Sequence, residues 1–344
     1  MKPQTSLDDR PATAAIPSST VTTIAYLALA LTWGSSFLFM KVALQEFTAA
    51  QVALGRILVG AVTLTTLMIA TRRAWPRERW LWGHMAVVSV FLCVVPFLLF
   101  AWAESILPSG IGAILNSTTP IWTAIAMTVI IRGTSLTRGQ VAGIALGAVG
   151  VLLIMGVWQV VTAPAFLGSL PAQAACLGAT ASYGLAFAWM QRYVNRKHRY
   201  DSVTIASVQL ANAAAISLVL VPFVAITPVV HQPAPTLCLL ALGMLGTGVA
   251  YVWNTRVVVT WGSLAASSVT YLTPVVGVFL GIVILGERLS WHEPLGAVIV
   301  IVSVMLVQKR RLPTAWLRNL YRSDRRPGGA HFSTRQPKVS PRAN

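Results

Sequence analysis

Charged residues are scarce in this chain, and acidic residues are the scarcest among them. Only 10% of the 344 residues are charged, and nine aspartates and glutamates stand against 26 lysines and arginines. A water-soluble protein carries about 25% charged residues. The composition therefore argues against a soluble protein, because helices this apolar would have no polar face to turn toward water.

The shortage of titratable side chains also argues against a catalytic or metal-binding site. His84 is the one histidine within an apolar segment, and no acid lies near it in the sequence. Cys93, Cys176 and Cys238 are far apart without metal-ligand spacing, so we interpret them as small buried residues. No glycine-rich phosphate loop is present, which excludes ATP-driven transport by this chain alone. We predict that the protein is not an enzyme and uses no cofactor or metal.

Long apolar runs take the place of the missing charge. Hydrophobic residues make up 56% of the chain, and the mean hydropathy is +0.70. A helix of about 20 apolar residues crosses the ~30 Å hydrocarbon core of a bilayer. Because period-two alternation is absent, we predict an all-α integral membrane protein with ten transmembrane helices. They lie near residues 22–44, 50–70, 80–102, 106–131, 138–158, 170–190, 202–226, 236–256, 262–285 and 291–308.

The basic residues predict how these helices are oriented. The connections after even-numbered helices hold Arg72, Arg73, Arg77, Arg79, Arg132, Arg138, Arg192, Arg196, Lys197 and Arg199. The connections after odd-numbered helices hold only Lys41 and Arg288. Basic connections face the cytoplasm. We therefore predict a multi-pass protein of the cell (inner or plasma) membrane with both termini in the cytoplasm.

The C-terminal tail, residues 309–344, carries ten lysines and arginines and a single acid, Asp324. A basic segment that follows a last transmembrane helix normally lies against anionic lipid headgroups. Trp316 and Tyr321 fall on one side of a possible helix flanked by arginines, which suits an interfacial helix. We favour contact with anionic lipid headgroups over simple disorder, and expect no nucleic-acid binding.

Short motifs recur in the same order in the two halves of the chain. Thr119-Pro120 returns 154 residues later as Thr273-Pro274, and Trp33-Gly34 returns 150 residues later as Tyr183-Gly184. Such ordered anchors indicate an internal repeat. Each repeat has five helices, and an odd number inserts the second repeat upside down, as in many secondary transporters. The predicted segments are a polar N-terminal tail at 1–21, repeats at 22–158 and 170–308, a short external linker at 159–169 and the basic C-terminal tail.

The chain resembles a known family of membrane carriers. The resemblance rests on WGSSFLFMKVAL in the first helix, Arg56 in the second, and AYVWNTRVVVTWGSLAASSVTYLTP with LGERLSWHEPLGAVIV in the second half. These stretches resemble EamA-type members of the drug/metabolite transporter superfamily. The resemblance implies two inverted five-helix repeats, alternating access, and small metabolites, often amino acids, moved outward. The family's Gly-Glu-x-Leu pattern after the fourth helix is missing here, since the chain reads Arg132-Gly133-Thr134-Ser135-Leu136.

Polar and aromatic residues within the helices are the candidates for a substrate cavity, because polarity is costly in lipid. Arg56 is a candidate ligand for a carboxylate or phosphate, or else a partner for Glu104 or Glu46. Proline frees the carbonyl four residues earlier, so Pro120 and Pro274 predict either cavity-lining breaks or simple packing kinks. The buried amides either bind substrate or join helices. The full predicted set is Trp33, Ser35, Arg56, Asn116, Pro120, Tyr183, Gln209, Asn254, Tyr271 and Pro274.

Three charged residues stand near predicted helix ends. Glu104, Glu287 and Arg288 are candidates for a gate at the cavity mouth. The alternative for Glu287 and Arg288 is that they only mark the end of a membrane helix. No acid or histidine lies at the centre of a predicted helix, so a proton relay at the midplane is not expected. Uniport, exchange and coupling through Glu104 all stay open.

We therefore predict a secondary transporter that moves a small metabolite by alternating access, with outward movement favoured. The substrate is an amino acid or a related compound, or a drug-like molecule. The alternatives are an intramembrane enzyme, which lacks a visible nucleophile-base pair or paired acids, and a scaffold or signalling protein acting through the basic tail. The sequence does not fix an oligomeric state.

Overall fold

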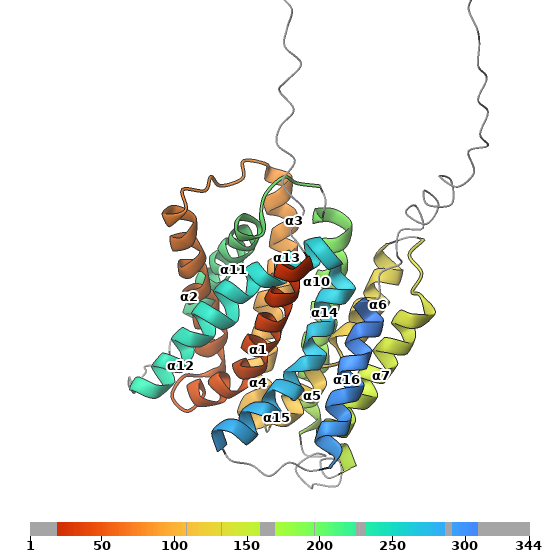
Figure 1. Cartoon of the computed structure of the whole chain (residues 1–344). Coiled ribbons are helices and arrows are strands. Elements are labelled where there is room, and N and C mark those ends of the chain that lie inside the picture. The colour runs from red at the N-terminus through yellow and green to blue at the C-terminus, as the bar shows by residue number, and fades with distance from the viewer. Residues whose placement is uncertain are drawn as a thin grey trace, which may run out of the picture. The chain divides into compact units, whose positions relative to one another are not determined.

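The computed structural model describes residues 19–107, 109–131, 133–158, 169–195, 197–224, 227, 232–285 and 291–308. All regular structure within these ranges is helical, and no strand occurs in them (Figure 1). The gate candidates Glu287 and Arg288, the linker core at 159–168 and the tail at 309–344 lie outside the described residues. The predicted helical class is confirmed over the part of the chain described.

Helices follow one another with short connections in both halves (Figure 1). The first half contains α1 (Ser19–Ala43), α2 (Ala49–Ala70), α3 (Arg79–Ser89), η1 (Val90–Val94), α4 (Val95–Ile106), α5 (Ser109–Asn116), α6 (Thr119–Ile130) and α7 (Arg138–Ile154). The second half contains α10 (Leu170–Trp189), η2 (Met190–Val194), α11 (Ser202–Val224), α12 (Pro233–Gly243), η3 (Met244–Val249), α13 (Ala250–Trp261), α14 (Ser263–Ser267), η4 (Ser268–Tyr271), α15 (Leu272–Leu285) and α16 (His292–Gln308).

Six of the described helical segments are long and apolar enough to cross a membrane. Two of them, Arg79–Ile106 and Pro233–Trp261, pass through the π-helical turns η1 and η3 without a break in the span. Helices α7 and α16 are shorter apolar helices that pack along each other. The structure is therefore that of a multi-pass membrane protein built from helices.

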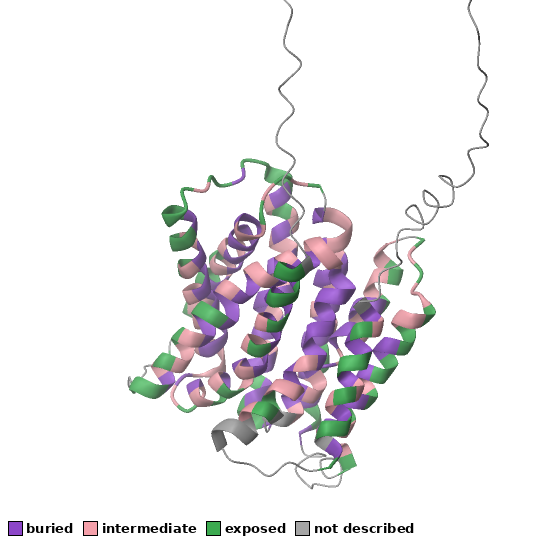
Figure 2. Ribbon diagram, viewed as in Figure 1, coloured by how far each residue is buried: buried purple, intermediate pink, exposed green. Residues whose placement is uncertain are grey.

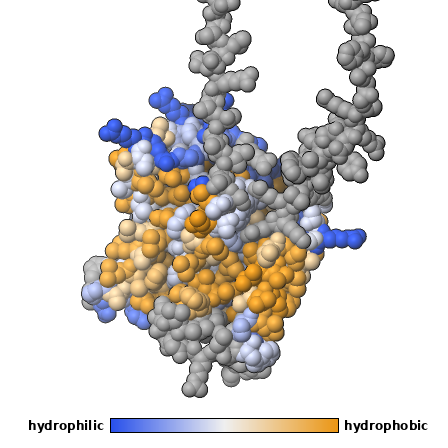
Figure 3. Space-filling view, in the orientation of Figure 1, coloured by the Kyte–Doolittle hydropathy of each residue, from blue (hydrophilic) through white to orange (hydrophobic). Residues whose placement is uncertain are grey.

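The outer surface of the helices is apolar. Phe223, Val129 and Ile69 are 77%, 75% and 70% exposed. Figure 3 shows apolar side chains over the middle of the molecule and hydrophilic ones gathered at the end that carries the α2–α3 connection. Buried residues lie on the inward faces of the helices (Figure 2). Soluble monomers rarely expose apolar patches of this extent, so this surface fits contact with lipid.

The helices that contain Pro120 and Pro274 are both interrupted just before the proline. A turn at residues 117–118 separates α5 from α6, and the 3₁₀ turn η4 precedes α15. The Thr119 hydroxyl donates to the Asn116 carbonyl at 2.6 Å, and the Thr273 hydroxyl donates to the Thr270 carbonyl at 2.8 Å. These are the two carbonyls that a proline four residues later leaves without an amide donor. The threonine before each proline therefore supplies the lost hydrogen bond.

Two glycines allow close approach at corresponding places in the two halves. A Cβ built on Gly34 of α1 would lie 2.6 Å from the Val276 side chain of α15. A Cβ built on Gly184 of α10 would lie 2.5 Å from the backbone of Trp122 in α6. Val276 and Trp122 each follow a helix-breaking proline by two residues. Each half thus places a glycine against the proline-containing helix of the other half.

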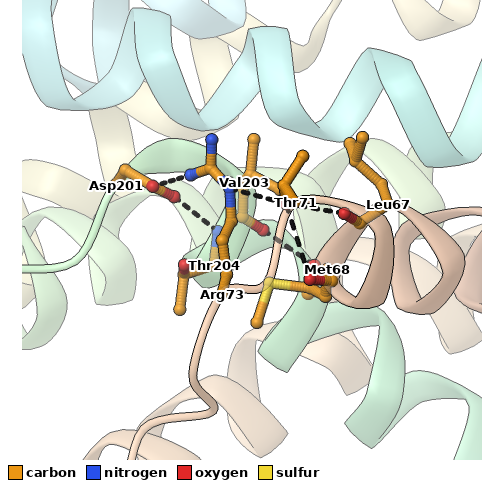
Figure 4. Close-up of polar contacts among 8 residues, drawn as sticks. Leu67, Met68, Thr71, Arg73, Asp201, Val203 and Thr204 are labelled. Carbon is orange, nitrogen blue, oxygen red and sulfur yellow. Dashed lines mark hydrogen bonds and ion pairs between the residues drawn. The ribbon is translucent and has the colours of Figure 1, made fainter.

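The connections gather at two opposite ends of the helices. Arg73, after α2, forms an ion pair with Asp201, before α11 (Figure 4), and Arg192 donates to the Ile130 carbonyl at the end of α6 at 2.6 Å. At the other end, the Gln232 amide donates to Glu46 at 2.9 and 3.0 Å. Successive helices therefore run in opposite directions between the two ends, as expected for successive membrane crossings.

Helix α7 shows the same separation. Its N-terminus follows the connection at residues 133–137, and the Thr137 side chain caps it. Near its C-terminus, the Leu153 carbonyl lies 3.0 Å from Nδ1 of His292, at the start of α16. The start of α7 and the start of α16 therefore lie at opposite ends of α7.

We expect a Tyr200→Phe substitution to change how stability depends on pH. The Tyr200 hydroxyl donates to Glu78 Oε2 at 2.5 Å and holds the pKa of this exposed carboxyl below its ordinary value of 4.5. A lowered folded-state pKa stabilises the protein above the ordinary pKa, and the gain is lost as the pH falls through the folded-state value. The melting temperature of the variant should therefore fall below wild type above pH 4.5 and converge with it at lower pH.

The matched control is the same substitution in a Glu78→Gln background, where it should have no pH-dependent effect. A difference between wild type and Tyr200→Phe that stays constant from pH 3 to pH 7 would contradict this assignment.

Candidate functional site

A cavity of about 60 Å³ lies among the helices of both halves. This is room for about four water molecules. It is lined by Trp33, Ser36, Phe37, Met40, Arg56, Leu92, Phe97, Phe100, Asn116, Thr119, Tyr183, Phe187, Tyr251 and Thr270. Most of these side chains are apolar or aromatic, with a few polar groups among them, which is the usual make-up of a small-molecule site.

Among the residues that the structure describes, Arg56 is the one arginine or lysine that lines the cavity. It stands on α2 and is only 6% exposed. Its Nε donates to the Thr247 hydroxyl at 3.0 Å, and Nη2 lies 3.5 Å from the Gly246 carbonyl in η3. The guanidinium carbon lies 3.9 Å from the centre of the Phe97 ring. These contacts fix the plane of the guanidinium while leaving further N–H donors of the fork for another group.

No carboxylate forms an ion pair with Arg56 among the residues that the structure describes. Glu46 instead accepts the Gln232 amide, so it is not the partner of Arg56. A buried guanidinium without a counter-ion is costly. A bound anion would supply the missing charge through bidentate hydrogen bonds, for which arginine is better suited than lysine.

Aromatic side chains form the cavity walls and are fixed by their polar atoms. The Trp33 indole Nε1 donates to the Gly246 carbonyl at 3.2 Å. The Tyr251 hydroxyl donates to the Leu92 carbonyl at 2.6 Å. This carbonyl receives no helix hydrogen bond from the residue four positions later, because that residue is Pro96 and has no amide hydrogen. The Tyr183 ring stacks on Phe100 with 6.0 Å between centroids. The rings therefore stand in fixed orientations around the guanidinium.

Polar groups near the two helix breaks complete the lining. Asn116 ends α5 and Thr119 begins α6, whereas Thr270 stands in η4 on the opposite half. The Ser117 hydroxyl donates to the Thr270 carbonyl at 3.1 Å and joins the two breaks directly. The cavity thus has one cationic wall and one wall of neutral hydrogen-bonding groups.

The structure brings four of the predicted site residues to this cavity: Trp33, Arg56, Asn116 and Tyr183. Ser35 is one position away from the lining residue Ser36, and its own hydroxyl bonds the helix backbone at Leu31 and Thr32. Pro120 and Pro274 shape the breaks without lining the cavity.

The remaining predicted residues lie in the protein interior outside the cavity lining. Gln209 Nε2 lies 3.5 Å from Cys93 Sγ. The Tyr271 hydroxyl donates to the Ile144 carbonyl at 2.8 Å, beside Gly147 of α7, so it joins helices. Asn254 is fully buried, with no hydrogen-bond partner for its amide among the described residues. Glu104 is also fully buried.

Sequence reasoning missed most of the apolar lining. On α1, Trp33, Ser36, Phe37 and Met40 follow the spacing of one helix face. Extending that spacing from Trp33 would have found them. The residues that the prediction left out are Ser36, Phe37, Met40, Leu92, Phe97, Phe100, Thr119, Phe187, Tyr251 and Thr270.

The chain is similar to known transporters. The sequence model of the EamA-like transporter family matches residues 21–156 and 170–308. A probable terminal-alkyne amino-acid exporter of Streptantibioticus cattleyicolor is 24% identical over 293 residues, covering 82% of this chain and 91% of that protein. The uncharacterized transporter YdfC of Bacillus subtilis is 23% identical over 279 residues, covering 78% of this chain and 85% of that protein.

Solved structures of similar fold exist, among them one named "Crystal structure of protein". It superposes with a TM-score of 0.63 at 18% sequence identity, and the match covers 88% of this chain and 99% of that one.

Proposed function

Because this chain is a membrane transporter that belongs to the EamA-like transporter family, we propose that it moves a small metabolite with a carboxylate group, an amino acid or a related compound. The proposed movement is outward across the cell membrane, by alternating access and without ATP. The observation that carries this proposal is Arg56, a buried cation with no acidic partner among the described residues, on the wall of a largely aromatic cavity. Such a wall accepts the carboxylate, while the rings accept an apolar side chain.

Several features support alternating access between two inverted repeats of five helices. The family model matches each half of the chain. The Gly34–Val276 and Gly184–Trp122 approaches are reciprocal between the halves, and both proline breaks use the same threonine bond. Substrate sites of inverted-repeat carriers lie between the repeats, at interrupted helices. The cavity has this position, since Asn116 and Thr270 next to the two breaks line it.

The charge distribution supports the proposed orientation. The basic connections at residues 71–78 and 197–201 share one end of the helices, through Arg73–Asp201 and Tyr200–Glu78. By the positive-inside rule this end faces the cytoplasm. We propose in addition that the basic tail, residues 309–344, contacts anionic lipid headgroups. The name of the Streptantibioticus relative supports an amino acid as the substrate class.

A thermal-shift screen of the purified protein tests the substrate class. We expect apolar and aromatic L-amino acids to raise the melting temperature, because a ligand that binds only the folded state stabilises it by about 2.7 kcal/mol at a hundred times its Kd. The matched methyl esters, which lack the carboxylate, should give a much smaller shift. Nucleosides, sugars and cationic drugs complete the panel. Equal shifts for the acids and their esters, or a shift with cationic drugs alone, would contradict the proposal.

A further inference from the structure

Glu104 is the most unusual charged residue among those described. It stands near the end of α4, its side chain is 0% exposed, and neither carboxyl oxygen has a hydrogen-bond partner in the described part of the chain. It is placed on the helix face that carries Phe97 and Phe100, both of which line the cavity. The spacing of three and four residues puts all three side chains on one stripe. The carboxyl therefore continues the cavity wall by one helical turn.

The helices around Glu104 show the same continuity with the cavity. On α5, Gly112 stands one turn before the lining residue Asn116, and a Cβ built on Gly112 would meet Glu104 Oε1 and lie 3.7 Å from Phe37. On α1, Lys41 stands one turn after the lining residue Phe37. The Lys41 ammonium donates to the main-chain carbonyls of Glu104 and Leu107 at 2.9 and 3.1 Å. Lysine and carboxyl are thus neighbours that are not bonded to each other in this conformation.

Among the residues that the structure describes, no group on the packed helices forms a hydrogen bond or an ion pair with this carboxyl. Helix α5 has no titratable residue. The titratable and charged groups on the elements packed against α4 are Tyr26 and Lys41 on α1, Arg56 on α2, Cys93 on η1, and Cys176 and Tyr183 on α10. An ionised carboxylate without hydrogen bonds is strongly disfavoured in such a place. The neutral, protonated form is the one compatible with this geometry.

We propose that Glu104 is a proton-binding site through which transport is coupled to the proton gradient. Its role in coupling rests on the proposed transport function, whereas proton binding stands on the geometry alone. In the conformation described, the carboxyl holds its proton. When the neighbouring helices separate and water reaches it, the O–H bond breaks, the proton leaves to that side, and the Lys41 ammonium is near enough to stabilise the carboxylate. A proton that binds from the outer side and leaves on the cytoplasmic side moves inward, opposite to the exported substrate.

Infrared difference spectroscopy of the purified full-length protein during a pH titration tests proton binding. We expect a protonated-carboxyl C=O band at neutral pH that disappears on alkalinisation. It should be absent from Glu104→Gln and unchanged in Glu46→Gln, the matched control on the connection between α1 and α2. A wild-type protein without such a band at neutral pH would overturn the proposal, and so would a band that survives in Glu104→Gln. The wild-type arm is decisive even if the variant fails to fold.

Proteoliposomes test the coupling, with a mixture of radiolabelled L-amino acids as the probe. Wild type should show counterflow without a pH gradient and accumulation driven by an imposed gradient. Glu104→Gln should keep counterflow and lose at least tenfold of the gradient-driven accumulation. Gradient-driven accumulation that is unchanged in the variant would overturn the coupling. Absence of any amino-acid movement in wild type would instead contradict the proposed function and leave the infrared result to decide proton binding.

Discussion

Replacing Arg56 with glutamine is expected to lower the transport of a carboxylate substrate about a hundredfold. Removing one partner of a buried, hydrogen-bonded charge pair costs about 2–5 kcal/mol, and 2.7 kcal/mol corresponds to a factor of a hundred. The substrate carboxylate would then enter an aromatic cavity whose described lining holds no cation, since Arg56 is the only arginine or lysine in that part of the lining. Initial rates of counterflow in proteoliposomes measure the effect.

Two further variants separate charge from geometry at this position. Arg56→Lys keeps the charge but loses the Nε bond to Thr247 and the planar contact with Phe97, so it should recover only part of the activity. Thr247→Val removes one partner of the guanidinium and keeps the charge, so it should cost less than either change at Arg56. If Arg56→Gln lowered binding of an amino acid and of its methyl ester by the same factor, Arg56 would not be the carboxylate ligand.

Gly184→Ala is expected to destabilise the protein strongly, whereas Gly178→Ala on the same helix is not. The new Cβ at position 184 would lie 2.5 Å from the Trp122 carbonyl carbon and 2.8 Å from the Thr123 amide nitrogen. Backbone atoms cannot move aside as a side-chain tip can, and overpacking of this kind costs about 1–3 kcal/mol. At position 178 the nearest atom is Leu99 Cδ1 at 3.7 Å, an ordinary contact.

Both substitutions gain the same helix propensity, up to about 1 kcal/mol, so the comparison isolates the contact with α6. The melting temperatures of the two purified variants in detergent should differ in opposite directions from wild type. The nearest atoms to a Cβ built on Gly34 are in the Val276 side chain at 2.6 Å, and the nearest backbone atom is the Thr273 carbonyl oxygen at 3.2 Å. Gly34→Ala should therefore be milder than Gly184→Ala, whose new Cβ meets backbone at 2.5 Å. Similar melting temperatures for Gly178→Ala and Gly184→Ala would show that α10 and α6 are not held as close as described.

The sequence predicts those parts of the fold that depend on local composition. Runs of apolar residues are sufficient to place membrane helices, and a proline within such a run is sufficient to predict the free carbonyls at Asn116 and Thr270. The threonine hydroxyls that donate to these carbonyls could also have been predicted, since both threonines stand directly before the proline. How the helices group around a cavity is not local and does not follow from the same signals.

The candidate site was predictable only where polarity or a motif marked a residue. Arg56 and Asn116 stand out because polar groups are rare in apolar helices. Which other residues line the cavity depends on how each helix is rotated about its own axis. Successive residues on a helix point about 100° apart, so Ser36 lines the cavity whereas Ser35 does not. The burial of Glu104 depends on Gly112, a glycine whose effect appears only when α5 is placed beside α4.

The two threonine bonds before the prolines have a mechanical consequence. A helix that bends at an ordinary residue must stretch or break a hydrogen bond between a backbone amide and the carbonyl four residues earlier. At Asn116 and Thr270 the donor within the same helix is a hydroxyl three residues along the chain, and the Ser117 hydroxyl also donates to the Thr270 carbonyl. A hydroxyl can rotate to follow its acceptor. The helices can therefore bend at these two interruptions while the Asn116 and Thr270 carbonyls keep their hydrogen bonds.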